Sequence, residues 1–175
     1  HQAVTNWVYN LPFGRGRKLF SGVPAPLNHI IGGWQVSGIA TLRTGTPYHV
    51  SYSGRLVGFP TSGRADVVGD WRVADPGVEG WFNPNAFRQP APFTLGNVGR
   101  NSMWAPGAWF LDAGIMKNFR FAERYDVQFR SEFFNMLNHP NPGGPGANLS
   151  VPSTFGKSTS FTAARVILFG LKFAF

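Results

Sequence analysis

Hydrophobic and polar residues alternate along five segments of the chain, 2–11, 33–43, 108–119, 125–134 and 161–175. An alternation with a period of two is typical of β-strands whose two faces meet different surroundings. No stretch of 12 residues carries a sustained apolar pattern at i, i+3 and i+4, so helical signals are nearly absent. The pattern predicts an all-β chain, an antiparallel up-and-down sheet of about five long strands.

The two faces of these segments differ in chemistry. One face carries charged side chains, namely Arg43, Asp112, Arg130, Glu132 and Lys172. The other face carries large rings, among them Trp7, Tyr9, Trp34, Trp109, Tyr125, Phe129 and Phe169. A soluble sheet with one buried face would alternate in the same way, so alternation alone does not identify the environment.

The lengths of the segments and of their connections favour a membrane barrel. The predicted strands have 10 to 15 residues, whereas soluble strands average about 5–6 and spanning strands need about 9–11. Short connections alternate with the very long ones at 52–107 and 135–158, both of which look irregular. Aromatic residues lie near the strand ends, as in interfacial girdles. The exception is the connection after the first strand, which is long for a periplasmic turn.

In such a barrel the charged face lines a hydrated lumen and the aromatic face contacts lipid. An alternative role for the five charged residues is cross-strand pairing that only stabilises the wall. A different class of protein also fits the pattern: a soluble, basic, β-rich module that binds polyanions or carbohydrate. The net charge of +8 suits any polyanionic partner and does not choose among them.

Composition excludes several other functions. The chain has no Cys, which rules out a disulfide scaffold, a thiolate metal site and a Cys nucleophile. The longest uncharged apolar run has six residues, 166–171, and a membrane-spanning helix needs about 20. The chain begins with His1 rather than Met, which suggests that processing or truncation removed its natural start.

Candidate chemistry is sparse. The four histidines lie at the start of the chain, in connections or just past a strand end, and no Gly-x-Ser-x-Gly motif is present. Asp66, Asp70 and Asp75 do not have the spacing of a calcium loop. The basic stretch 14–18 could touch RNA or anionic headgroups, but it is not a phosphate loop. We expect no enzymatic activity, no cofactor, no metal and no nucleic-acid partner.

An ordered set of motifs resembles the closing part of the Oar-like TonB-dependent outer-membrane receptors. The motifs are NWVYNLPFG at 6–14, GGWQVSG at 32–38, WFNPNAF at 81–87, GNVGRN at 96–101, DAGIMKNF at 112–119, EFFNMLNHPN at 132–141, FG at 155–156 and the terminal Phe175. The resemblance covers nearly the whole chain, and its specificity lies in the order of the motifs.

The resemblance implies that residues 1–175 are a C-terminal fragment of a barrel of about 22 strands. It implies a place in the bacterial outer membrane and a part in energised uptake of an unidentified solute. The partners implied are outer-membrane lipid and lipopolysaccharide, the remainder of the barrel and a plug, and TonB acting through the absent N-terminal part. If Phe175 lies at the periplasmic side, the connections 52–107 and 135–158 are both extracellular.

The last strand resembles the signal that the barrel-assembly machinery recognises. Its elements are Gly170, Phe173 and the terminal Phe175, although Leu168 stands where a polar residue is usual. Phe173 and Phe175 share the parity of the aromatic face. Backbone pairing of an extended strand with the machinery's own sheet would give affinity, and alternate side chains would give specificity.

Overall fold

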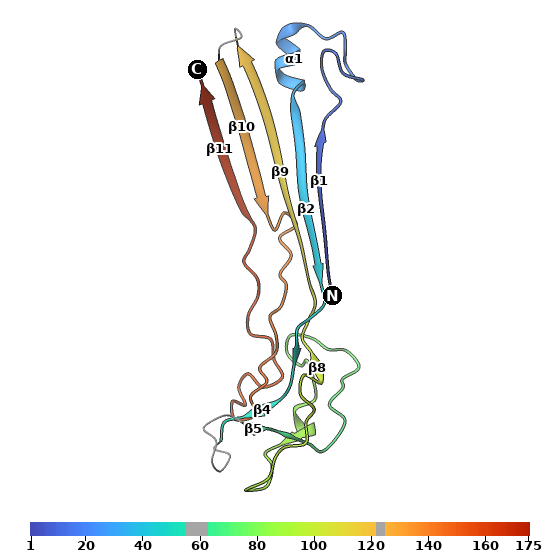
Figure 1. Ribbon diagram of the computed structural model, residues 1–175, viewed down its shortest axis with the longest axis vertical. Helices are drawn as coiled ribbons and strands as arrows, with labels where there is room; N and C mark the ends of the chain where they lie inside the picture. Colours follow the sequence, from blue (N-terminus) through green and yellow to red (C-terminus); the bar gives the residue numbers. More distant parts are fainter. Residues whose placement is uncertain (55–62, 122–124) are drawn as a thin grey trace. The chain divides into compact units, whose positions relative to one another are not determined.

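The computed structural model of the chain describes residues 1–54, 63–121 and 125–175 (Figure 1). It consists of two compact units. The first, here called the strand unit, comprises residues 1–42, 109–139 and 163–175. The second, the loop unit, comprises residues 43–108 and 140–162.

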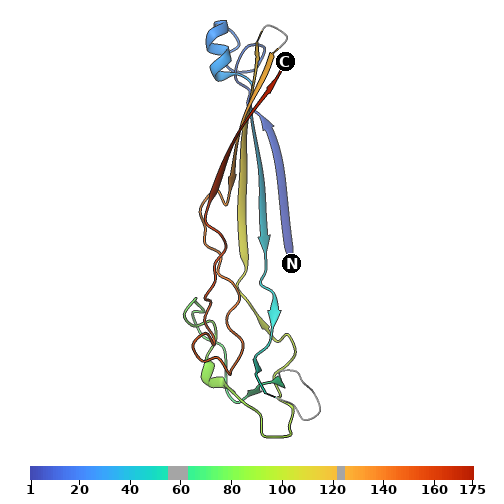
Figure 2. The ribbon, with the colours of Figure 1, turned by 90° about the vertical axis from the view of Figure 1, so that its left-hand side faces the viewer.

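The strand unit is an open sheet of five long strands. The strands are β1 (Gln2–Asn10), β2 (Trp34–Arg43), β9 (Ala108–Phe121), β10 (Tyr125–Phe134) and β11 (Val166–Ala174). They lie in the order β1-β2-β9-β10-β11, so β1 and β11 form the two edges. Figures 1 and 2 show the strands side by side along their length. The all-β antiparallel fold predicted from the sequence is confirmed, and the open sheet fits part of a barrel.

The strand register sorts the side chains into two faces. Phe129 of β10 lies opposite Lys117 of β9 and Leu171 of β11. Its neighbour Arg130 lies opposite Met116 and Gly170. Residues directly opposite each other in an antiparallel pair share a face. The same register puts Gln128 opposite Asn118 and Lys172, on the face of Arg130, so the two faces predicted from alternation continue over β9, β10 and β11.

The strand bounds agree with the sequence pattern to within two residues, except at the start of the last strand. β10 spans the predicted residues 125–134, whereas β11 begins at Val166 instead of residue 161. The backbone before Val166 pairs with the connection after β10: Thr162 N–H donates to Asn141 O and Arg165 N–H donates to Asn138 Oδ1. Because these backbone groups bond to residues 138 and 141 and not to β10, the β-ladder between β10 and β11 begins only at Val166.

The structure contains a short helix that the sequence pattern did not indicate. α1 (Ala25–Ile31) lies in the connection between β1 and β2. Pro26 stands in its first turn, where the missing N–H costs nothing, and the helix ends at Gly32, whose N–H donates to Asn28 O. Seven residues are too few to show a periodic pattern, which explains why the sequence did not reveal it. Within the described residues, no helix has the length and apolar character needed to cross a membrane.

The loop unit corrects the expectation that residues 52–107 are irregular. Within residues 43–54, 63–108 and 140–162 it contains three two-stranded ribbons and one 3-10 turn. They are β3 (Pro47–Tyr48) with β8 (Met103–Trp104), β4 (Ser51–Tyr52) with β5 (Gly63–Arg64), β6 (Asp66–Val67) with β7 (Phe87–Arg88), and η1 (Pro84–Ala86).

The loop unit also has a hydrophobic core of its own. Phe82 is 1% exposed and makes edge-to-face contacts with Phe87 and Phe155, with ring centroids 5.4 and 5.1 Å apart. Phe155 comes from the second long connection, so both connections contribute to one core. The remaining core residues are Val50, Ala65, Ala86, Val98 and Met103. Burial of these side chains stabilises the loop unit, whose segments form no long strands of their own.

Candidate functional site: the two faces of the sheet

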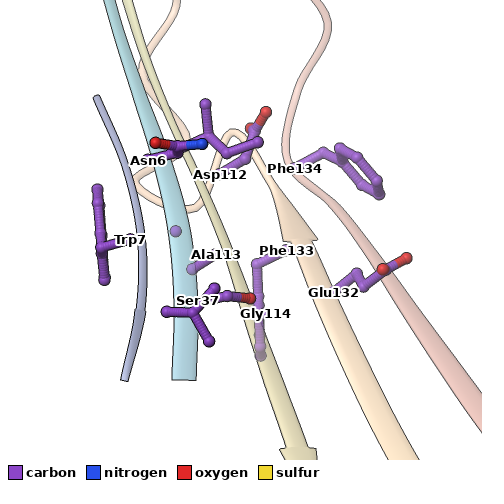
Figure 3. Close-up of a pocket in the computed structure, with 12 residues that line it drawn as sticks. Asn6, Trp7, Ser37, Asp112, Ala113, Gly114, Glu132, Phe133 and Phe134 are labelled. Carbon is purple, nitrogen blue, oxygen red and sulfur yellow. The ribbon is translucent and has the colours of Figure 1, made fainter. Parts of the chain in front are cut away.

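The polar face of the sheet contains a hollow of about 290 Å³ between β1, β2, β9 and β10 (Figure 3). Gly114 lines this hollow without a side chain. A Cβ at this position would point towards Ser37 and come within 2.8 Å of its Oγ, so any other residue would fill part of the space. Two carboxylates, Asp112 and Glu132, line the hollow together with apolar side chains. The other residues of the lining are Asn6, Trp7, Val8, Gly38, Ile39, Ala113, Phe133 and Phe134.

Both carboxylates of the hollow have partners within the strand unit. Glu132 Oε1 lies 2.8 Å from Arg130 Nε, and the two side chains are 34% and 55% exposed. Pairs exposed to this degree contribute about 0–1 kcal/mol. They lie on one strand, so this pairing runs along β10 and is not the cross-strand pairing considered from the sequence. Asp112 Oδ1 accepts a hydrogen bond of 2.8 Å from Asn135 N–H, which ties the end of β10 to β9.

The remaining predicted polar residues lie elsewhere. Lys172 lines a second hollow of about 330 Å³ with Asn118, Asp126, Gln128 and Ala174. Arg43 is the last residue of β2 and is exposed. The structure therefore brings Asp112 and Glu132 to one hollow and Lys172 to another.

The opposite face is aromatic and largely exposed. The ring of Phe129 stacks with that of Phe169 at 6.3 Å, and Tyr125 stacks with Phe173 at 6.0 Å. Phe169 is 72% exposed and the terminal Phe175 is 87% exposed. Of the other predicted members of this face, Trp7, Tyr9 and Trp109 are exposed and Trp34 is half-buried. Gly170 is on the polar face, opposite Arg130.

The aromatic face holds one charged residue to which the sequence analysis gave no role. Lys117 is only 2% exposed, and its Nζ donates hydrogen bonds to Ile30 O at 2.8 Å and Gly32 O at 2.6 Å. The ammonium also lies over the rings of Trp34 and Phe119, at 4.6 and 4.8 Å. Lys117 stands between Ile115 and Phe119 at a position where the alternation predicts an apolar residue, and this exception could have revealed the contact.

Asn135 is a second residue whose role the sequence analysis missed. It follows β10 with a φ of 50°, a conformation in which Asn is favoured. Its side chain accepts from His139 N–H at 2.9 Å and donates to His139 O and Ala163 O, both at 3.1 Å. Asn135 therefore joins the end of β10 to the segment that leads into β11.

The ionisable groups Tyr48, Asp66 and Asp70 belong to the loop unit, and their surroundings are structural. Burial raises the pKa of Tyr48 well above its usual range, so this hydroxyl stays protonated at ordinary pH. Asp66 accepts from Asn97 N–H at 3.0 Å, and Asp70 accepts from Arg72 N–H at 3.0 Å. Among residues 1–54, 63–121 and 125–175, no three His, Cys, Asp or Glu side chains gather in a way that could hold a metal ion.

Long antiparallel strands with one polar and one exposed aromatic face define the wall of a membrane β-barrel. A sequence model of the outer membrane beta barrel domain matches residues 1–167. The chain belongs to this family, and its place is the bacterial outer membrane. Comparisons with curated proteins and with solved structures give no match.

Proposed function

We propose that this chain forms part of the barrel wall of a TonB-dependent, Oar-like receptor that takes up a solute. The observation that carries the proposal is the open sheet, whose edges β1 and β11 run in the same direction (Figure 1). Outer-membrane barrels have antiparallel neighbours, so β1 and β11 cannot pair directly in such a barrel. An odd number of further strands must stand between them, as the large barrel of a receptor would supply.

The proposal assigns a partner to each face. The aromatic face contacts lipid, and lipopolysaccharide surrounds its outer end. The polar face, with its hollow at Asp112 and Glu132, faces the lumen and meets a plug or the solute. The loop unit lies outside the cell. Energy reaches the barrel through a plug and TonB, so the proposal gives no residue of this chain a catalytic role or a cofactor.

Exposure of the aromatic face argues against a soluble binding module. Leu171 is 73% exposed and Phe173 is 56% exposed, next to Phe169 on the same face. Monomeric soluble proteins rarely expose a continuous apolar surface of this kind, whereas lipid covers it in a barrel.

The test of energised uptake compares three strains that produce the full-length protein, lack it, or lack TonB. Each strain is grown in the same medium, and the compounds removed from the medium are identified by mass spectrometry. We expect the same compound to remain in both deletion cultures, and the receptor gene on a plasmid to restore its removal only where TonB is present. A compound that still disappears without TonB would contradict the proposal.

A second measurement distinguishes a plugged receptor from an open porin. The full-length protein is reconstituted in a planar lipid bilayer and its conductance is recorded. A receptor whose lumen is filled is expected to give no steady current. Stable open channels would identify a passive pore instead, because a water-filled barrel conducts ions without an energy source.

A further inference from the structure

The connection between β1 and β2 is a built structure, here called the rim turn (residues 12–33). Asn28 organises it: its Oδ1 accepts from Arg15 N–H at 2.7 Å, and Gly14 and Gly32 both pack directly against its side chain. Arg15 Nε also donates to Val23 O at 2.9 Å. The backbone of Leu19 pairs with residues 12 and 14. Hydrogen bonds therefore hold the backbone that carries the exposed side chains of the rim turn.

Two contacts place the rim turn on the aromatic side of the sheet. Trp34 Nε1 donates to Ile30 O at 2.9 Å, and Lys117 Nζ donates to the same carbonyl oxygen at 2.8 Å. Both side chains belong to the aromatic face. The C-terminal end of α1 thus lies beside the surface that contacts lipid, at the same end of the sheet as the C-terminus (Figures 1 and 2).

The rim turn exposes apolar side chains. Phe20 is 63% exposed, Ile30 66% and Leu27 43%. Phe20 has a φ of 59°, a conformation that is rare for a bulky residue. Residues held in sparsely populated backbone conformations cluster at functional sites.

The rim turn is also purely cationic. Residues 12–33 contain Arg15, Arg17 and Lys18, all exposed, and no Asp or Glu. Large apolar side chains beside Lys and Arg are the composition of segments that lie in a membrane interface. Each Lys or Arg near an anionic bilayer strengthens binding roughly fivefold.

We propose that the rim turn docks on anionic phospholipid of the periplasmic leaflet. Phe20, Leu27 and Ile30 enter the boundary between headgroups and acyl chains, and the basic residues contact lipid phosphates. The end of the sheet that carries the C-terminus is the periplasmic one, since the opposite end carries the long connections. The inference rests on this orientation of the barrel and not on the proposed uptake.

The test uses the full-length protein in lipid nanodiscs made with and without phosphatidylglycerol. A Ser21→Cys variant carries an environment-sensitive fluorophore, in a background without other accessible cysteines. We expect brominated lipid to quench this fluorophore, and phosphatidylglycerol to increase the quenching. The double variant Arg17→Gln/Lys18→Gln should weaken the attraction of the rim turn to the anionic bilayer roughly tenfold or more, so that its quenching with phosphatidylglycerol falls towards the level seen without that lipid. Phe20→Ser/Ile30→Ser should reduce quenching in both lipids.

Matched controls separate docking from a general effect on folding. Arg72→Gln removes a cation of the loop unit whose side chain is 73% exposed, and it should leave the quenching unchanged. Each variant must keep the heat-dependent shift in gel mobility of a folded barrel. Equal phosphatidylglycerol dependence of Arg17→Gln/Lys18→Gln and the parent protein would overturn the proposal. So would a fluorophore that iodide quenches equally in detergent and in every nanodisc.

Discussion

Truncation of Phe82 tests whether the loop unit folds around its own core. The substitution Phe82→Ala removes a ring that is 1% exposed and contacts Phe87 and Phe155 edge-to-face. Phe→Ala in a packed core costs about 3–5 kcal/mol, and burying an aromatic ring of roughly 150–250 Å² supports a similar magnitude. A loss of about 4 kcal/mol raises the population of the opened loop unit roughly several-hundredfold.

Limited proteolysis in detergent measures this population, because cleavage follows the opened state when opening is fast. We expect Phe82→Ala to be cut within residues 43–108 or 140–162 far faster than the parent protein, while the long strands stay protected. The matched control is Phe93→Ala, since Phe93 is in the same unit but is 84% exposed. Equal cleavage rates for the two variants would refute a cooperative core in this unit.

Three further changes test other parts of the structure. Asp112→Ala should cost about 1.5–3 kcal/mol, because it removes a charged acceptor from a backbone N–H, and Asp112→Asn should cost less; thermal unfolding in detergent measures both. Gly45→Ala should destabilise the loop unit by about 1–3 kcal/mol, because a Cβ would collide with the carbonyl of residue 105, whereas Gly77→Ala meets open space and should be neutral in the same assay. Deletion of Phe175 combined with Phe173→Ala should sharply lower the amount of receptor in outer-membrane fractions, and normal levels would contradict an assembly signal in the last strand.

The sheet could be predicted from the sequence because successive side chains of each strand alternate between its two faces, which meet different surroundings. Alternation over 125–134 gave both ends of β10, since the segment changes to turn residues at each end. β11 was predicted to begin five residues too early, because alternation continues into a segment whose backbone bonds go to residues 138 and 141. Such non-ladder bonds leave no trace in the hydropathy pattern.

The loop unit and the rim turn could not be predicted in the same way. The core around Phe82 is formed from single aromatic residues separated by turns, so no local period marks it. α1 is shorter than two helical turns, and its support comes from Lys117, 87 positions away from Ile30. Alternation predicted that both carboxylates of the hollow share a face, but it could not predict the space between them, which depends on the absence of a side chain at Gly114.

The shared core of the loop unit limits how this region can diverge or be transplanted. Its two segments, 43–108 and 140–162, are separated in the sequence by two strands, yet Phe155 of the second completes the packing around Phe82 of the first. A chimaera that exchanges one segment alone would leave a hole where the missing ring belongs. Recombination between related barrels should therefore transfer both segments as a pair, and a change in one should select for compensation in the other.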